Sequence, residues 1–394
     1  MPPTLQRVPT VGRARSAVIL AMHGYPLSQR LGILLIWSLS ACADVVPGSG
    51  AENSRFPLDD QGVAGGPAVA VDDFNACEFQ VLAELDESGG VVVERFSYWS
   101  DGFRILGTSC RPASPGPHPL LIYNHGGIIG LWESDTTMCV RLARGGGMWV
   151  LMPEYRGQGG SEGDIEMCLG EVDDVLELLT CSQTRDDVDP DRVALMGWSH
   201  GGCVTLRALQ RGAQVRAAID IHGVTDWVGV YDFTIEKLAN PGLDPELREV
   251  YAATMAKLEQ GAGGAPSEAP EAYRDRSPLA FPEAFDDFQG DLLVLHGTED
   301  IFVPAGQACA LAAAQGDFGS VHIDGSGASV SSAPPGCEDA GLEFGQESAP
   351  ESPSEASRRL EVYEGAGHNI RAGTEPAQRV SASALRFLAR HFRE

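Results

Sequence analysis

Lysine is almost absent from this chain: among 394 residues only Lys237 and Lys257 occur, and acidic residues outnumber basic ones by 55 to 28. The formal net charge of −27 argues against the basic surface that binds nucleic acid or an anionic membrane. No Cys-x-x-Cys or His-x-x-x-His spacing occurs, so the short ligand pairs typical of zinc sites are missing. We therefore expect no nucleic-acid partner, no bound metal and no other cofactor.

The sequence also lacks an obvious membrane span, because the apolar stretch at 31–41 is well short of the ~20 residues that a spanning helix needs. Arg30 precedes this stretch and small residues lead to Cys42, which is typical of a secretory signal. Residues 39–42 (Leu-Ser-Ala-Cys) resemble a bacterial lipobox. We expect 1–41 to be a lipoprotein signal peptide. The exported protein would then be anchored to the periplasmic or outer face of the bacterial cell envelope only through a lipid at Cys42.

Two alternatives remain open for this N-terminal region. Residues 1–21 are long for the basic segment of a signal peptide, so Met22 is an alternative start. The apolar stretch could instead be a buried helix of a soluble protein. Beyond it, residues 42–76 are rich in Gly, Pro, Ala, Ser and Asp. This composition predicts a flexible tether ahead of a folded domain at 77–394.

Short apolar runs alternate with helical patterns through most of the remaining sequence. This alternation predicts an α/β fold with a mostly parallel central sheet and helices on both faces. The stretches 91–99 and 103–107 flank a Ser-Asp-Gly turn and predict an antiparallel hairpin at one edge of the sheet. The runs expected to be parallel strands are 119–124, 148–152, 192–196, 217–221, 292–297 and 360–363.

Two segments interrupt the alternation. Residues 227–285 combine a helical stretch with a Gly/Ala/Pro/Ser break, and we expect a cap-like insertion there. Residues 316–357 form an acidic, low-complexity segment that can bury little apolar surface, so we expect a loop. Eight cysteines follow Cys42, and an exported chain could pair them. Cys309 and Cys337 bracket a loop and are the pair that the sequence suggests.

The sequence Gly-Trp-Ser-His-Gly at 197–201 stands between an apolar run and a helical pattern. Gly-x-Ser-x-Gly in that setting predicts a nucleophile elbow, a sharp strand-to-helix turn that presents the Ser199 hydroxyl at the end of the strand. Small residues must flank the serine because the turn is tight, and Gly197 and Gly201 meet that need. We expect Ser199 to be the nucleophile.

An acid and a histidine follow Ser199 in the chain order that an α/β hydrolase requires. Asp300 comes just after the strand at 292–297, and His368 follows the strand at 360–363. Because the carboxyl ends of parallel strands meet at one edge of a sheet, we expect the three side chains to converge there. His368 would accept the proton of Ser199. Asp300 would orient the imidazole and stabilise its protonated form.

Other residues compete with Asp300 and His368 for these roles. Asp300 could also act only as a helix N-cap, since a helical pattern follows it. His125 and His296, which stand at strand ends, are expected to be structural or to line the site. The competitors are Glu299 and the more distant Asp226 for the acid, and His23, His118, His125, His200, His222, His296, His322 and His391 for the base.

Backbone donors for a developing negative charge are expected on two segments. Residues 125–127 (His-Gly-Gly) follow the strand at 119–124, and glycines allow the backbone to approach a ligand closely. We expect the N–H of Gly127 to be one oxyanion donor. The N–H of His200, the residue after the nucleophile, would be the second.

These motifs together resemble the α/β-hydrolase superfamily and, more narrowly, the catalytic domain of the prolyl oligopeptidase family of serine peptidases. The resemblance implies an α/β-hydrolase fold with Ser199 as the nucleophile, Asp300 as the acid and His368 as the base. The segments that carry it are 100–102 (Ser-Asp-Gly), 125–127 (His-Gly-Gly), 155–157 (Tyr-Arg-Gly), 189–193 (Asp-Pro-Asp-Arg-Val), 197–202 (Gly-Trp-Ser-His-Gly-Gly), 277–279 (Ser-Pro-Leu), 296–304 (His-Gly-x-x-Asp-x-x-Val-Pro) and 367–368 (Gly-His).

The chain departs from this family on the N-terminal side. Typical members carry a large β-propeller that filters substrates by size, and the segment between Cys42 and the hydrolase domain is too short for one. Dienelactone hydrolases share much of the layout but generally use a cysteine nucleophile, against which Ser199 speaks. We expect a serine hydrolase that cleaves a small peptide or ester through an acyl-enzyme. A carboxylesterase-like envelope hydrolase is one alternative, and a non-catalytic binding protein on the same fold is another.

Overall fold

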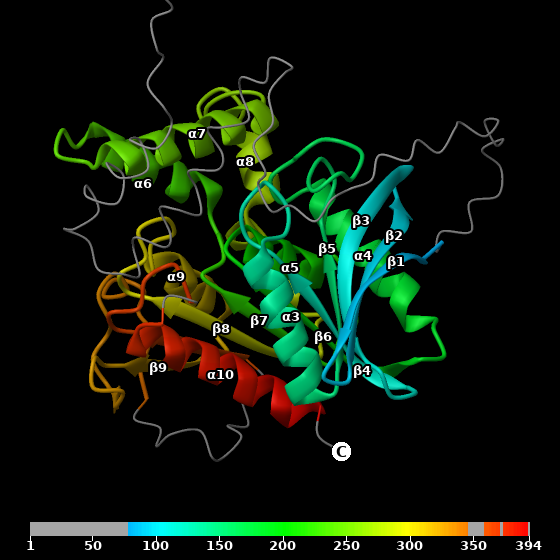
Figure 1. Cartoon of the computed structure of the whole chain (residues 1–394). Helices are drawn as coiled ribbons and strands as arrows, with labels where there is room; N and C mark the ends of the chain where they lie inside the picture. Colours follow the sequence, from blue (N-terminus) through cyan, green and yellow to red (C-terminus); the bar gives the residue numbers. More distant parts are fainter. Residues whose placement is uncertain (1–77, 346–357, 371–372, 393–394) are drawn as a thin grey trace, which may run out of the picture.

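The computed structural model describes residues 78–345, 358–370 and 373–392 of the chain (Figure 1). The predicted signal peptide 1–41, the lipidation site Cys42 and the tether 42–76 lie outside these residues. Within the described part, no helix has both the length and the hydropathy needed to cross a membrane.

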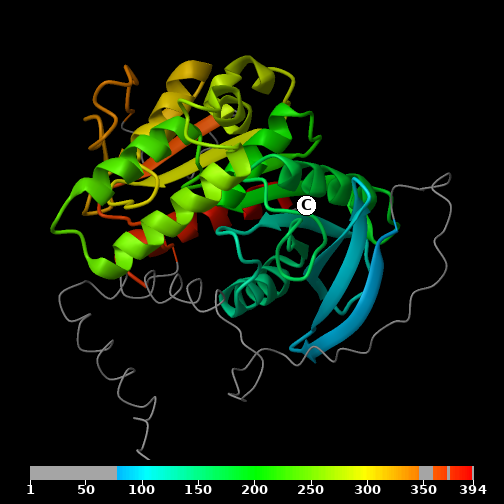
Figure 2. The same cartoon turned by 90° about the horizontal axis from the view of Figure 1, so that it is seen from above.

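One eleven-stranded sheet runs through the described residues, in the order β1-β2-β3-β5-β4-β6-β7-β8-β11-β9-β10. Neighbouring strands from β5 to β9 pair in parallel, while β1, β2, β3 and β5 pair antiparallel at one end and β9 pairs antiparallel with β10 at the other. Figure 2 shows the antiparallel end in blue, across the molecule from the orange C-terminal strands. The predicted sheet with its antiparallel hairpin at one edge is confirmed. The bounds are Gln80–Ser88 (β1), Val91–Ser100 (β2), Phe103–Pro112 (β3), His118–Asn124 (β4), Trp149–Pro153 (β5), Val188–Trp198 (β6), Ala217–Ile221 (β7), Asp291–Gly297 (β8), Gly319–Ile323 (β9), Ser329–Val330 (β10) and Arg358–Tyr363 (β11).

Helices cover both faces of the sheet, also as predicted (Figure 1). Side chains of β4 divide between two apolar clusters: Leu120 and Ile122 join one, and Leu121 and Tyr123 join the other. This division follows from the two-residue period of a strand, and a parallel sheet covered on both sides needs apolar residues on both faces. The first cluster includes α4 (Gly170–Gln183), α5 (His200–Gln210) and α9 (Gly306–Gln315), and the second includes α3 (Glu133–Gly146) and α10 (Glu375–Phe392).

The insertion expected at 227–285 folds mainly as helices. Tyr251 of α7 donates its hydroxyl hydrogen to the carbonyl oxygen of Ile301, and its ring centre lies 5.5 Å from that of Phe302. The insertion therefore rests on the loop that follows β8, and its role as a cap stays a prediction. Its elements are α6 (Trp227–Ala239), α7 (Pro245–Ala262), α8 (Pro270–Arg276) and the 3-10 turns Pro278–Ala280 and Pro282–Phe285.

Three strands, β1, β9 and β10, were not predicted from the sequence. The side chains of β1 are mostly exposed on both faces, so its sequence has no alternation to reveal it. β9 and the two-residue β10 lie inside the segment 316–357, which was expected to loop out, and for these two strands that expectation is wrong. Val321 of β9 is buried, and the strand pairs in parallel with β11. The polar composition of the whole segment conceals two short strands within it.

Three disulfides join pairs of described residues. Cys110–Cys139 links β3 to α3, and Cys168–Cys203 links the loop before α4 to the first turns of α5. Cys309–Cys337, the pair suggested by the sequence, links α9 to the chain after β10. The second bridge therefore lies close to the turn that carries Ser199.

Candidate active site

A sharp turn between β6 and α5 holds Ser199. The backbone of this residue has φ 58° and ψ −120°, which non-glycine residues rarely adopt. The flanking glycines are required sterically. A Cβ on Gly197 would lie 2.0 Å from the carbonyl oxygen of Gly201, and one on Gly201 would lie 2.0 Å from that of Asn124. The strand-turn-helix geometry of an elbow is therefore present, with Ser199 half-buried at the carboxyl end of β6.

Ser199, His368 and Asp300 form a continuous chain of hydrogen bonds. Nε2 of His368 lies 2.9 Å from Oγ of Ser199, and Nδ1 of the same ring lies 2.7 Å from Oδ2 of Asp300. Asp300 follows β8 and His368 follows β11, and these two strands pair in parallel. The carboxyl edge of the sheet thus brings together the three side chains that the sequence predicted to converge.

The carboxyl group of Asp300 is fully buried and multiply hydrogen-bonded. Its Oδ1 accepts from the backbone N–H groups of Phe302 and Val303, at 2.8 and 2.9 Å. Burial alone would raise the pKa of Asp300, but nearby His368, His222 and His296 outweigh it and hold the pKa below its usual value. Asp300 is therefore a carboxylate at neutral pH, ready to stabilise a positive charge on His368.

The competing acids lie elsewhere. Glu299 is exposed. Asp226 caps the start of α6, where its side chain accepts from the N–H of Val228. Asp300 accepts hydrogen bonds from two backbone N–H groups just ahead of α9 and also contacts the imidazole of His368. It therefore takes part both in the local turn and in the contact with the histidine.

Two histidines that stand at strand ends make structural contacts, as expected. The ring of His125 stacks on Tyr155 with centres 4.4 Å apart. Nε2 of His296 donates to the carbonyl oxygen of Val303 at 2.9 Å, and the same nitrogen lies 3.6 Å from Oδ2 of Asp300. His222 was not singled out from the sequence, yet it contacts both Asp300 and His368. In the sequence, the only sign that His222 lies near the site was its position directly after the predicted strand 217–221.

A buried ion pair holds the loop after β5. The side chain of Arg156 is 5% exposed and that of Asp174 is fully buried, with Nη2 2.8 Å from Oδ1. Burial raises the pKa of Asp174 to about 6, against the opposing effect of Arg156. Arg156 also pairs with Asp101 at 2.9 Å. Because protein groups already occupy this guanidinium, its role is to hold the loop rather than to bind substrate.

The segment proposed to supply oxyanion donors lies against the turn that carries Ser199. A Cβ on Gly126 would lie 3.1 Å from Cβ of Ser199. Gly127 has φ 79° and open space where a side chain would stand. Nδ1 of His200 donates to the carbonyl oxygen of Gly127 at 3.2 Å, which ties the His-Gly-Gly segment to the start of α5. The two predicted donors, Gly127 and His200, therefore belong to segments in direct contact.

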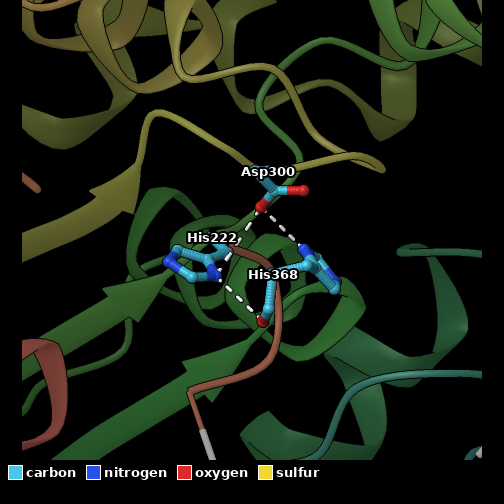
Figure 3. Close-up of side chains that lie close together, drawn as sticks. All are labelled: His222, Asp300 and His368. Atoms are coloured by element: carbon cyan, nitrogen blue, oxygen red, sulfur yellow. Dashed lines mark hydrogen bonds and ion pairs between the residues drawn. The ribbon is translucent and has the colours of Figure 1, made fainter. Parts of the chain in front are cut away.

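His222, Asp300 and His368 also resemble a metal-ligand set, since they offer ligand atoms within 4.8 Å of one another (Figure 3). A metal would need an unprotonated nitrogen from each histidine. Nδ1 of His222 faces the carbonyl oxygen of His368 at 3.0 Å, and Nδ1 of His368 faces the carboxylate of Asp300. Both oxygens only accept, so both Nδ1 atoms carry hydrogens and neither of these two nitrogens is free to bind a metal. The cluster fits a hydrogen-bond network rather than a metal site.

Comparison with known proteins relates part of this chain to a family. Residues 136–317 match the model of the prolyl oligopeptidase family, Peptidase_S9, a range that includes Ser199 and Asp300 and ends before His368. Over 204 residues the chain is 28% identical to the uncharacterized peptidase YtmA of Bacillus subtilis (strain 168), which covers 52% of this chain and 71% of that protein.

Solved structures with the same fold include an esterase and a peptidase. Acetyl xylan esterase 1 from Thermoanaerobacterium sp. JW/SL YS485 superposes with a TM-score of 0.52 at 16% identity, over 80% of this chain and 89% of that one. Acylaminoacyl peptidase of Pyrococcus horikoshii gives a TM-score of 0.52 at 17% identity, over 76% of this chain and 41% of that one. Residues 136–317 thus resemble the prolyl oligopeptidase family and the described residues have an α/β-hydrolase fold, and the chain is a serine hydrolase, a peptidase or an esterase.

Proposed function

We propose that Ser199, His368 and Asp300 are the catalytic triad of this hydrolase and that it works through an acyl-enzyme. The observation that carries the proposal is the chain of two hydrogen bonds, 2.9 Å from Ser199 to His368 and 2.7 Å from His368 to Asp300. The turn that holds Ser199 supports it, because a serine with a strained, left-handed backbone between a strand and a helix is what a nucleophile elbow requires.

Each residue then has one chemical step. Oγ of Ser199 attacks the substrate carbonyl carbon while Nε2 of His368 takes its proton. Asp300 stabilises the imidazolium that results. The same proton passes to the leaving amine or alcohol as the scissile bond breaks. Water repeats both steps on the acyl-enzyme, which releases the acid product and restores the Ser199 hydroxyl.

The backbone N–H groups of Gly127 and His200 would stabilise the negative oxygen of each tetrahedral intermediate. Their support is the contact between the His-Gly-Gly segment and the start of α5. The N-terminus of α5 adds a favourable partial positive charge at the same point. Donors of this kind contribute about a hundred- to a thousandfold to the rate.

The substrate of this proposal is a small peptide, because the matched family consists of serine peptidases. A carboxylesterase-like activity is the second candidate. One observation favours it: the imidazole of His368 contacts the aromatic rings of Trp198 and Phe302, with centres 5.4 and 5.2 Å away. Aromatic rings beside the imidazole suit an uncharged acyl group.

We also propose that the protein is exported and attached to the bacterial cell envelope by a lipid on Cys42. The signal-like sequence 31–42 supports this, and so do three disulfides among the described residues, since disulfides persist in oxidising compartments. A Cys42→Ser variant should move from the membrane fraction to the soluble fraction of cells with its ester turnover unchanged. Retention in the membrane would contradict the anchor.

The activity is tested with the purified full chain on matched chromogenic substrates. These are short-chain p-nitrophenyl esters and aminoacyl or prolyl p-nitroanilides, with Ser199→Ala as the control. The control should lose about a millionfold in kcat. Anilide turnover that vanishes in the control would establish a peptidase, and ester turnover alone would establish an esterase. Substantial turnover by Ser199→Ala would overturn the triad, and failure of the wild type to react with a fluorophosphonate would favour a non-catalytic binding protein.

A further inference from the structure

His222 follows β7, the strand that lies between β6 and β8. Its side chain is fully buried, and its backbone N–H donates to the carbonyl oxygen of Leu295 at 2.9 Å. Its φ of 55° lies in the left-handed region, which Asn, Asp, His and Gly adopt more readily than other residues. The edge of the sheet therefore fixes where the ring of His222 lies, independently of the loop that carries His368.

The ring of His222 holds the main chain of His368. Its Nδ1 donates to the carbonyl oxygen of His368 at 3.0 Å (Figure 3). The indole Nε1 of Trp198 donates to the same oxygen at 2.9 Å. One carbonyl is thus held from the ends of two neighbouring strands, β7 and β6, while the imidazole of the same residue reaches toward Ser199.

The same Nδ1–H also faces the acid, because Nδ1 of His222 lies 3.6 Å from Oδ2 of Asp300. The other nitrogen, Nε2, is buried and has no hydrogen-bond partner among the described residues. Burial lowers the pKa of His222 to about 3, with Asp300 opposing this shift and His296 and His368 adding to it. The ring is therefore neutral at physiological pH and adds no positive charge that would repel the imidazolium of His368.

We propose that His222 is a positioning residue that sets the distance from His368 to both Ser199 and Asp300 by donating to the His368 carbonyl. This inference rests on the proposed triad and goes beyond it. His222 touches no substrate and moves no proton. It acts on the step in which Nε2 of His368 must meet the hydroxyl of Ser199, where a displacement of about 1 Å can lower a rate about a hundredfold.

Two variants distinguish an effect of the hydrogen bond from an effect on folding. His222→Asn suits a left-handed backbone and carries an amide N–H close to the place of Nδ1. His222→Gly suits the same backbone and has no donor. We expect His222→Gly to lower kcat on a p-nitrophenyl ester by about 10- to 100-fold with KM unchanged. His222→Asn should keep kcat within about threefold of wild type.

A spectroscopic signature accompanies the kinetics. The proton between His368 Nδ1 and the Asp300 carboxylate should give a ¹H NMR signal far downfield of the amides, in wild type and His222→Asn. We expect exchange broadening of this signal in His222→Gly. Thermal unfolding checks that each variant folds. Should His222→Gly fail to fold, His222→Ala replaces it, because its methyl side chain cannot donate a hydrogen bond, and the same loss of kcat is expected.

The outcomes distinguish this inference from the proposed function. Wild-type kcat in the variant that lacks the donor would overturn the role of His222 and leave the triad standing. An equal loss in His222→Asn and His222→Gly would show that ring shape matters rather than the hydrogen bond, and would also overturn it. Activity retained in Ser199→Ala would instead overturn the triad itself.

Discussion

Two buried carboxylates of this chain, Asp300 and Asp174, have opposite surroundings. Asp174 pairs with the guanidinium of Arg156, which carries a permanent charge. Asp300 has no such ion pair within the described part of the chain. Three histidine nitrogens lie 2.7, 3.6 and 3.6 Å from its Oδ2, and two backbone N–H groups donate to its Oδ1.

The difference fits what each site would do if Ser199, His368 and Asp300 act as proposed. A fixed cation suits Asp174, because the loop after β5 only has to stay in place. A fixed cation beside Asp300 would compete with the imidazolium of His368 for the same oxygen. The histidines beside it, His222 and His296, are instead kept neutral by burial, which lowers the pKa of both. The carboxylate is thereby stabilised without its charge being cancelled.

Removing the charge of Asp300 should have the largest effect of the changes considered for these carboxylates. In Asp300→Asn the side chain keeps its size but loses the charge that stabilises the imidazolium and selects the tautomer of His368. We expect kcat to fall by about ten-thousandfold, with the fold intact by circular dichroism. The exposed neighbour provides a matched control, since Glu299→Gln should retain wild-type kcat. A small loss in Asp300→Asn would mean that another group stabilises the charge on His368.

Removing the cation from the other carboxylate should affect stability rather than chemistry. Arg156→Met leaves Asp174 buried and unpaired, and we expect the unfolding free energy to fall by about 3–5 kcal/mol. The kcat of the folded fraction should change little. Urea unfolding measures the first quantity and ester hydrolysis the second. The double variant Arg156→Met/Asp174→Leu should recover part of the lost stability, and failure to do so would contradict the assigned pair.

Asp220 sharpens the comparison because, among the described residues, it pairs with neither an arginine nor a histidine. Its carboxylate is buried beside α5, where a Cβ on Gly202 would lie 2.2 Å from its Oδ1, and no side-chain donor within the described residues contacts it. Burial raises the pKa of Asp220 from 3.8 to about 7, against the opposing effect of the backbone N–H of Gly223. Between these values the folded state binds more protons than the unfolded state. The unfolding free energy should therefore fall as pH rises through this range.

Asp220→Asn removes this titration and so gives the smallest of the three effects. We expect the variant to gain ~1–4 kcal/mol relative to wild type on going from pH 5 to pH 8. The measurement is urea unfolding of both proteins at the two pH values. The difference between them isolates Asp220, since Asp174, whose pKa is also raised, is common to both. Parallel pH profiles would show that Asp220 does not titrate in this range.

The sequence was sufficient to predict the fold class and the three residues of the hydrogen-bonded chain. Buried parallel strands are apolar throughout, so their carboxyl ends can be located, and Ser199, Asp300 and His368 each follow such an end. The turn that holds Ser199 could be predicted because its close backbone packing requires glycine on either side of the serine.

The features that the sequence did not reveal depend on contacts without a local pattern. β1 pairs through its backbone while most of its side chains stay exposed, and β9 is a short strand in a polar segment. His222 was concealed for a different reason. Its role depends on a left-handed backbone and on a bond to the main chain of a residue 146 positions away. Neither property can be read from the identity of the residue.

The parallel pairing of β11 with β8 has a consequence for how this enzyme can change. In that pairing Val362 of β11 lies opposite His296 of β8. The pairing sets the distance from His368 to Asp300, whatever the number of residues in the chain between β8 and β11. Lengthening a surface connection is inexpensive, since each doubling adds only ~0.6 kcal/mol of closure entropy. The chain between β9 and β11 is therefore free to lengthen during evolution, or to accept an inserted module by design, beside an acid and a base that keep their spacing.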